Sequence, residues 1–294
     1  MGKVLRKILT FVLLGVFLFS SVKILMILKT YRDSKIVYDE AVESFVRPAA
    51  LPKPAASAGA GAGTAAPASG GAESSAPAAQ AQPPVEAEEL RYGVYAPIAV
   101  DFEALCELND DVFGWLYCED TVINYPVAWG RDNAFYLTHN YRGAYDRSGT
   151  IFSDMKNEKG VSDSNIIIYG HHMYNMTMLG SLEFWREQKY YDEHPVMWLL
   201  TPEQDYRVEL FSCYETEGTS DVYTVFHEPC DDLRSYIRNA AENSLFSAPF
   251  DYDPEAHYIV LSTCSYTFFL ARTVLHGKLV PVDSAGGMPL PGFA

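Results

Sequence analysis

The sequence has little positive charge. Its 294 residues contain 22 lysines and arginines against 38 aspartates and glutamates, which gives a formal net charge of −16. A nucleic-acid-binding surface needs clustered basic side chains to neutralise phosphates, so we do not expect a nucleic-acid partner. The acidic surplus instead favours the solubility of an exposed domain.

Metal-ligand spacings are also lacking. The five cysteines are Cys106, Cys118, Cys213, Cys230 and Cys264. None forms a CxxC pair and no HExxH motif occurs, which argues against zinc and thioredoxin-like chemistry. We therefore expect no metal and no cofactor. An odd number leaves at least one thiol unpaired if the others form disulfides, and the sequence is equally compatible with five free thiols.

Aromatic residues are absent from residues 49–89, where alanine, glycine, proline and serine dominate. This composition offers no apolar surface whose burial could offset the entropy of ordering the backbone. We expect a disordered linker over residues 49–90, acting as a flexible tether whose use is reach. A low-complexity insertion without a role is the alternative.

A long apolar run covers residues 8–28, and its length suits a single membrane-spanning helix with Lys23 near one end. A cleaved signal peptide is the competing interpretation. The run is too long for a typical signal sequence, and no small-x-small cleavage site follows it. Basic residues flank both ends, so the charge rule orients the helix only weakly.

The residues after this run have helical periodicity. Val37, Ala41 and Phe45 share one face, which predicts a short amphipathic helix within residues 29–48. Such a helix would lie immediately beyond the membrane.

Residues 91–281 have the composition of a folded domain, rich in aromatic and β-branched side chains. The segments that read as strands are 122–129, 149–154, 165–170, 196–200, 206–215, 258–264 and 272–280. The segments that read as helices are 101–109, 178–187 and 229–244. So many short strands predict one closed or nearly closed β-barrel with peripheral helices. Residues 282–294 are too short and polar to anchor anything, and we expect a flexible tail.

The last two strands end in chemically interesting residues. Cys264 closes the first, and Arg272 opens the second after a turn of seven residues. If the strands pair antiparallel, the thiol and the guanidinium lie together at one rim of the barrel, where loops often carry functional sites. Alternation places Arg272, Val274, His276 and Lys278 on one face. From spacing alone, Cys264 could be a core residue, half of a disulfide or a nucleophile. Arg272 could equally be an ordinary arginine at the rim of the barrel.

A third strand ends in NIIIYGHHM, in which Gly170 precedes His171 and His172. A histidine at a strand end beside a glycine is well placed to project into a cleft. Cysteine and histidine are the minimal set for thiol nucleophilic catalysis. A distant Cys–His pair is weak evidence by itself.

These strings together resemble the class B sortases. The string LSTC followed by Arg272 is similar to the family's TLxTC-then-arginine signature, and IYGHHM is similar to its histidine segment. The helical insert at 229–244 and the segment NDDVFGWLYCEDTVINYPVAWG resemble further parts of the class B domain in the family's order. Two positions depart from the pattern. Val260 replaces the usual threonine, and Tyr266 stands where some members have an aspartate, so that aspartate's role does not transfer.

The resemblance implies a mainly β fold, a closed sortase-type barrel of about eight strands with peripheral helices that include one before the cysteine-bearing strand and others at the N-terminus. It implies a cysteine transpeptidase that cleaves a C-terminal sorting motif of secreted proteins and transfers the acyl group to a peptidoglycan amine. Residues 1–7 would then be cytoplasmic, residues 8–28 the single-pass anchor, and the catalytic domain extracellular. The absence of an Asp-Pro-aromatic motif before the barrel disfavours the pilin-polymerising class.

The resemblance also implies residue roles. Cys264 would be the nucleophile, His171 the general acid and base, and Arg272 the group that stabilises the oxyanion and holds substrate. The residues expected to contact substrate are Ser262, Thr263 and Tyr266. The reserve candidates for the base are His172 and His276.

Two other functions remain to be weighed. A papain-like cysteine protease predicts a cysteine on a helix near the start of the domain with histidine downstream, and the order here is the reverse. A non-catalytic extracellular binding domain predicts that Cys264 is buried or bridged. Labelling with a thiol-reactive vinyl sulfone discriminates between these functions, because only a catalytic Cys264 reacts ahead of Cys118 and Cys213.

Overall fold

The computed structural model describes residues 2–49 and 95–283. The helices are α1 (Gly2–Phe45), α3 (Phe102–Leu108), α4 (Gln188–Glu193) and α5 (Asp231–Glu242), and the 3-10 turns are η1 (Phe135–Leu137), η2 (Gly180–Arg186) and η3 (Asp221–Tyr223). The strands are β1 (Val46–Pro48), β2 (Ile98–Val100), β3 (Val112–Tyr117), β4 (Asn124–Trp129), β5 (Ile151–Ser153), β6 (Asn165–Tyr169), β7 (Val196–Leu200), β8 (Asp205–Glu217), β9 (His257–Cys264) and β10 (Ala271–Val282).

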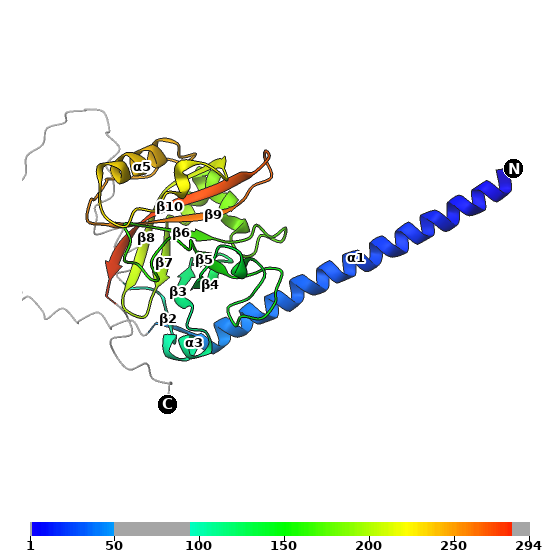
Figure 1. The fold of residues 1–294 in the computed structure, drawn as a ribbon, viewed down its shortest axis with the longest axis horizontal. Coiled ribbons are helices and arrows are strands. Elements are labelled where there is room, and N and C mark those ends of the chain that lie inside the picture. The colour runs from blue at the N-terminus through cyan, green and yellow to red at the C-terminus, as the bar shows by residue number, and fades with distance from the viewer. Residues whose placement is uncertain (1, 50–94, 284–294) are drawn as a thin grey trace, which may run out of the picture.

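Strands β3 to β10 form a closed barrel in the order β10-β8-β7-β3-β4-β5-β6-β9 (Figure 1). The pairs β4–β5 and β6–β9 are parallel, and the other neighbours are antiparallel. Closure removes exposed sheet edges and leaves one face of each strand for the interior. The predicted closed barrel of about eight strands is confirmed.

Each predicted strand segment corresponds to an observed strand, but β1, β2 and β3 were not predicted. Of these three, β3 is the one that belongs to the barrel. Its sequence, VFGWLY, contains Gly114, and the pairing with β4 is irregular at that point. A Cβ at Gly114 would lie 3.1 Å from the carbonyl oxygen of Leu200 on the neighbouring strand, so the glycine permits a close backbone approach. The predicted helix over 178–187 is instead the 3-10 turn η2, which leads into α4.

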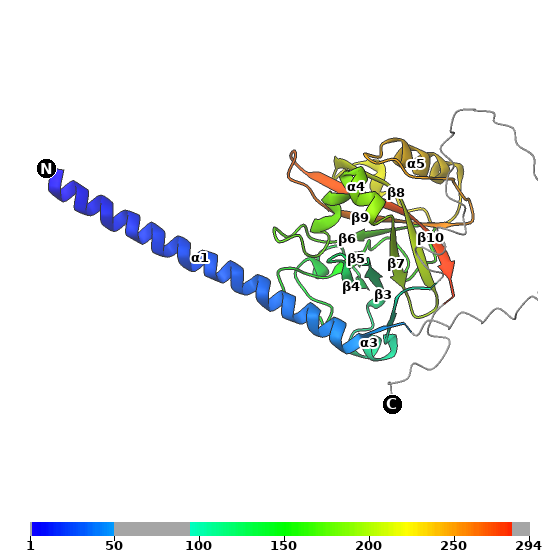
Figure 2. The same cartoon turned by 180° about the vertical axis from the view of Figure 1, so that it is seen from behind.

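Helix α1 combines the apolar run and the predicted amphipathic segment into one helix of 44 residues. Its apolar part has a mean hydropathy of 2.5 and no buried residues, and it is long enough to cross a membrane. Its C-terminal part packs on the barrel through Tyr38, Ala41 and Phe45. Ser34 donates a 2.5 Å hydrogen bond to Asp146 Oδ1. The free part of α1 therefore projects from the barrel in Figures 1 and 2.

The amphipathic helix ends at Phe45, three residues earlier than predicted, and residues 46–48 form β1. β1 pairs antiparallel with β2, and the amide of Ala49 donates to the carbonyl of Pro97. Residues that flank the predicted linker on its two sides are thus hydrogen-bonded to each other. The expectation that this segment gives the domain reach is wrong, because the separation between α1 and the barrel does not depend on its length. Beyond Ala49 the predicted linker lies outside the described residues, as does the tail after residue 283.

Helix α5 covers part of the outer face of the barrel. Cys230 Sγ accepts from the amide of Leu233 at the helix N-terminus, and Asp231 and Asp232 occupy the first turn, where the helix dipole favours negative charge. Leu233 and Ile237 are buried against Phe211 of β8. The insert between β8 and β9 thereby seals the middle of the neighbouring strands.

Candidate active site

The β9–β10 hairpin brings the predicted nucleophile and arginine together. Cys264 and Arg272 are Cα partners in the antiparallel register, and both are partly exposed. Val260 and Val274, which share their face, pack outside the barrel against Val222. Cys264 and Arg272 therefore stand on the outer face at the rim, where the loop leaves them open to solvent.

Strand β6 brings the histidine segment to the same rim. It runs parallel to β9 with Tyr169 opposite Ser262, and the amide of Gly170 donates to the carbonyl of Ser262. His171 follows the pair Tyr169–Ser262 by two residues, and the next residue, His172, contacts the carbonyl of Cys264, so the histidine segment lies at the rim that carries the thiol. A Cβ at Gly170 would lie 2.6 Å from Leu179 Cγ, so only glycine fits at the point where the chain leaves β6.

The two adjacent histidines have different surroundings. His171 is half-buried and its Nε2 lies 2.7 Å from the carbonyl oxygen of Leu137. Because that carbonyl can only accept, Nε2 carries the hydrogen and Nδ1 is left to exchange protons.

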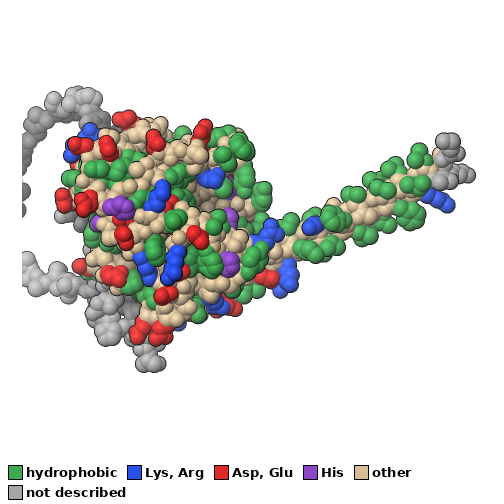
Figure 3. Space-filling model, viewed as in Figure 1, with side chains coloured by type: hydrophobic (Ala, Val, Ile, Leu, Met, Phe, Trp, Pro, Cys, Tyr) green, Lys and Arg blue, Asp and Glu red, His purple; other side chains and the backbone are tan. Residues whose placement is uncertain are grey.

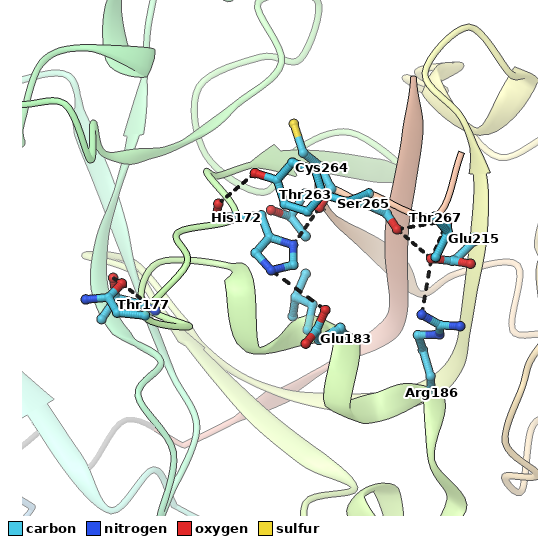
Figure 4. A network of polar contacts seen from close by, with 12 residues as sticks. His172, Thr177, Glu183, Arg186, Glu215, Thr263, Cys264, Ser265 and Thr267 are labelled. Atoms are coloured by element: carbon cyan, nitrogen blue, oxygen red, sulfur yellow. Dashed lines mark hydrogen bonds and ion pairs between the residues drawn. The ribbon is translucent and has the colours of Figure 1, made fainter. Parts of the chain in front are cut away.

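His172 is buried and supports the end of β9. Its Nδ1 donates to the carbonyl oxygen of Cys264 at 2.7 Å, and its Nε2 lies 3.7 Å from Glu183 Oε2. Figure 4 shows the Cys264 sulfur pointing away from the His172 ring. His172 therefore holds the backbone of the cysteine and does not face its thiol.

The guanidinium of Arg272 lies against the backbone of Gly218, which has no side chain to displace it. A Cβ at Gly218 would lie 3.5 Å from Arg272 Cζ, so the guanidinium passes close over this glycine. Its Nη1 donates to the carbonyl of Ala271 at 3.1 Å. The rest of this forked donor is available for a bound carbonyl or oxyanion.

Tyr223, on η3, is a site neighbour that the sequence did not predict. Its hydroxyl lies 3.0 Å from Ser262 Oγ. Burial raises the pKa of Tyr223, the bond to Ser262 and the charge of Arg272 oppose that rise, and the Cys264 thiol adds to it. The phenol thus lies within electrostatic range of both Cys264 and Arg272. No sequence pattern marked it, because it lies in an irregular segment between β8 and α5.

The three predicted substrate contacts are placed differently from one another. Ser262 is buried beside Tyr223. Thr263 faces inward and its hydroxyl donates to the carbonyl of Gly170 at 2.8 Å, so it crosslinks β9 to β6 rather than lining an open surface. Tyr266 is exposed and its ring stacks on Tyr174 at 5.7 Å.

A carboxylate from the opposite side of the hairpin holds the turn. Glu215 Oε1 on β8 accepts from Ser265 Oγ at 2.5 Å, from Thr267 Oγ1 at 3.0 Å and from Arg186 Nη1 at 3.2 Å (Figure 4). This network ties β8, η2 and the turn together beside Cys264. It was not predicted, since a glutamate on a strand gives no signal of its partners.

The five cysteines all lie in the described residues and all are free thiols. Burial raises the pKa of Cys118 to about 12 and that of Cys213 to about 12. These two thiols are therefore chemically inert near neutral pH, because the thiolate is the reactive form. The disulfide interpretation of Cys264 is excluded in this structure.

Comparison with known proteins decides the family. No protein-family model matches the chain. Sortase B of Listeria monocytogenes is 30% identical over 280 residues, which cover 94% of this chain and 97% of that protein. The chain belongs to the class B sortases.

Solved structures agree with this assignment. A Staphylococcus aureus sortase B–substrate complex is 28% identical with a TM-score of 0.58 and covers 62% of this chain and 85% of that one. A sortase B complexed with triglycine is 30% identical with a TM-score of 0.57 and covers 62% and 86%. This class B sortase is accordingly a cysteine transpeptidase, and the papain-like and non-catalytic alternatives are set aside.

Proposed function

We propose that this sortase is a membrane-anchored transpeptidase that cleaves a C-terminal sorting motif of secreted proteins and transfers the acyl group to a peptidoglycan amine. The observation that carries the proposal is the pairing of Cys264 with Arg272 across the hairpin, with His171 two residues beyond the end of the neighbouring strand β6. Three groups of suitable chemistry meet at one open rim of the barrel.

In the first half-reaction, the Cys264 thiolate attacks the carbonyl carbon of the scissile peptide bond. The carbonyl electron pair moves to oxygen, and the Arg272 guanidinium stabilises that oxyanion with fixed charged donors. The intermediate collapses to a thioester, and His171 gives its Nδ1 proton to the departing amine. Separating these steps makes a difficult substitution into two easier ones.

In the second half-reaction, the acceptor amine replaces the departed peptide. His171, now neutral, takes a proton from the attacking amine through Nδ1. The new tetrahedral intermediate expels the Cys264 thiolate and forms the new peptide bond. The relatives crystallised with a substrate and with triglycine support a peptide donor and an amine acceptor for this chain.

The half-buried Tyr223 and the buried Ser262 support contacts with the residue that carries the scissile carbonyl. The exposed Tyr266 lies in the turn itself, two residues after Cys264. These contacts suit an extended peptide that passes across the rim.

We assign α1 as a single-pass anchor, with residues 1–7 in the cytoplasm, residues 8–28 in the membrane and the barrel outside the cell. Its exposed apolar part supports the anchor. Cys230 is exposed on the barrel and offers a test of orientation. With the other partly exposed thiols removed by Cys106→Ser and Cys264→Ala, a membrane-impermeant maleimide applied to intact cells labels the protein that keeps Cys230 and not the one that also carries Cys230→Ser, if the barrel is outside. Equal labelling of the two contradicts the orientation.

The catalytic proposal is tested with the full-length protein in vesicles, a library of fluorogenic sorting-motif pentapeptides, and triglycine as acceptor. We expect mass spectrometry to detect the peptide joined to triglycine for wild type and for His172→Asn, but not for Cys264→Ala or His171→Ala. Equal product from Cys264→Ala overturns the nucleophile. Cleavage that never yields a triglycine adduct overturns the amine acceptor.

A further inference from the structure

The turn between β9 and β10 carries a group of exposed apolar side chains directly beyond the nucleophile. Phe269 is 89% exposed, Leu270 50% and Phe268 45%. Tyr266 and Tyr174 beside them are 63% and 76% exposed. Bare aromatic tips of this kind on a folded domain mark a surface that meets a partner. These five residues are called the apolar tip.

The apolar tip lies close to α1, although far from it in sequence. Tyr174 stacks on Tyr266 with the two rings 8° from parallel. The phenol of Tyr31 on α1 contributes to the raised pKa of Tyr266, whose main cause is burial, so the two phenols are near one another. Tyr31 also shares a cavity of about 440 Å³ with Asn175 and Thr177, which follow Tyr174 in the chain.

Tyr31 lies at the start of the part of α1 that holds the barrel. The apolar run ends at Leu28, so Tyr31 follows it by three residues, or about 5 Å along the helix. Ser34 and Tyr38 then fix the helix to the barrel through Asp146 and the carbonyl of Gly149. Because α1 is continuous through this region, the barrel cannot move far from the end of the run.

The views of the whole molecule agree with this placement. The β9–β10 hairpin projects from the barrel on the side toward which the free part of α1 extends (Figures 1 and 2). The free part of α1 is covered with hydrophobic side chains and the surface of the barrel carries mixed charges (Figure 3). The apolar tip is thus on the membrane side of the barrel.

We infer that the apolar tip rests in the interfacial layer of the same membrane that α1 crosses, as a second contact between the barrel and the bilayer. Aromatic side chains favour this layer, and Phe268, Phe269 and Leu270 add apolar surface that can enter it. This inference rests on the proposed anchoring by α1.

The contact has a consequence for the reaction site. Cys264 immediately precedes the tip, and the amide of Ser265 donates to the carbonyl of Ala271 at 2.9 Å, which closes the turn directly above the nucleophile. A tip resting on the bilayer holds Cys264 near the membrane surface. Substrates that are themselves held in the membrane then meet the thiol within a thin layer, which raises their effective concentration.

The test uses the full-length protein in vesicles of phosphatidylcholine and phosphatidylglycerol, with phosphatidylcholine brominated either near the headgroup or near the chain ends. Phe269→Trp reports on the apolar tip. Leu108→Trp is the matched control, since Leu108 is also exposed but ends α3, which packs against the far end of α1. Phe19→Trp reports on the anchor itself. The fluorescence of the parent protein is subtracted.

We expect Phe269→Trp to lose most of its added fluorescence with headgroup-brominated lipid and less with chain-end-brominated lipid. Leu108→Trp loses none, and Phe19→Trp is quenched most by bromines deep in the bilayer. If Phe19→Trp is quenched and Phe269→Trp behaves like Leu108→Trp, the inference fails while the anchor stands. If Phe19→Trp is not quenched, the anchor and the inference both fail.

Two other partners for the apolar tip, a second copy of the chain or the peptide substrate, would give different fluorescence results. Contact between two copies of the chain makes the Phe269→Trp emission depend on the protein-to-lipid ratio, without quenching by bromine. A tip that serves only the peptide substrate shows an emission shift when a sorting-motif peptide is added, again without bromine quenching. Either result overturns the membrane contact.

Discussion

The open end and the sealed middle of one face of β10 differ in what they can hold. Arg272 stands at the rim beside Cys264 and is partly exposed. His276, four residues further on the same face, has no exposed surface. Among the described residues, neither of its ring nitrogens has a hydrogen-bond partner. The open end of β10 can hold the charge of Arg272, whereas the sealed middle cannot hold a charged His276.

The insert between β8 and β9 causes this difference in exposure, because it covers His276 and leaves Arg272 open. The ring of His276 stacks on Tyr214 at 5.3 Å, and Phe211 and Tyr236 complete an aromatic enclosure beneath α5. Burial lowers the pKa of His276 to about 3. The reserve role of His276 as a base is therefore excluded, because a sealed neutral imidazole has no access to substrate.

The largest expected effect comes from removing the nucleophile at the open end. We expect Cys264→Ala to reduce transpeptidation by roughly 10⁴-fold or more, as loss of a nucleophile does in other covalent enzymes. Cys213→Ala is the control because Cys213 is sealed inside the barrel. Rates are compared by the peptide-transfer assay. A Cys213→Ala loss as large as that of Cys264→Ala would contradict the assignment.

The next largest effect distinguishes the two histidines that follow β6. We expect His171→Ala to reduce the rate by about 10²- to 10⁴-fold, since it removes the proton carrier, and to lower the melting temperature less than His172→Ala because His171 and the carbonyl of Leu137 are only half-buried. His172→Ala leaves the carbonyl of Cys264 without its donor, so we expect a lower melting temperature and a smaller loss of rate. Thermal unfolding and the pH dependence of kcat/KM measure both. If the His172 variant alone loses the basic limb of the pH profile, the roles are reversed.

The comparison along β10 predicts a third difference. We expect Arg272→Lys to lower kcat by roughly 10²-fold, because an ammonium cannot reproduce the forked donor geometry toward the oxyanion. His276→Leu should leave kcat unchanged. Steady-state kinetics of the two variants measures this. Equal losses of kcat in the two variants would contradict the independence of His276 from the reaction site.

The smallest effect is on stability. His276 binds a proton in the unfolded chain below its ordinary pKa of about 6.5 but not in the folded protein until the pH falls to about 3. Stability therefore falls as the pH falls through this window, by up to about 1.4 kcal/mol per pH unit from this one group. His276→Leu should reduce that slope. Urea unfolding at several pH values measures it, and an unchanged slope would contradict a sealed neutral histidine.

Much of this site could be predicted because local patterns determine it. The alternation of β10 predicts the shared face of Arg272, Val274 and His276, and the turn of seven residues predicts the pairing of Cys264 with Arg272. Gly170 marks the point where β6 ends, and the structure shows why no larger residue fits there.

Features that depend on distant segments could not be predicted. The sequence shows that His276 shares a face with Arg272, but not that Tyr236 of α5 covers it. The sequence likewise does not show that Glu215 accepts hydrogen bonds from the turn. The composition of residues 49–89 indicates a tether, but β1 before that segment pairs with β2 after it. In each case the missing information is a contact between residues far apart in the chain.

The central claim is that Cys264 at the open end of the hairpin forms the thioester. The most direct measurement is intact-protein mass spectrometry after rapid acid quench of the full-length protein with a cleavable sorting-motif peptide and no acceptor amine. We predict an added mass equal to the acyl fragment, mapped by digestion to the peptide that contains Cys264 and absent in Cys264→Ala. An adduct on another residue, or turnover by Cys264→Ala, would contradict the account.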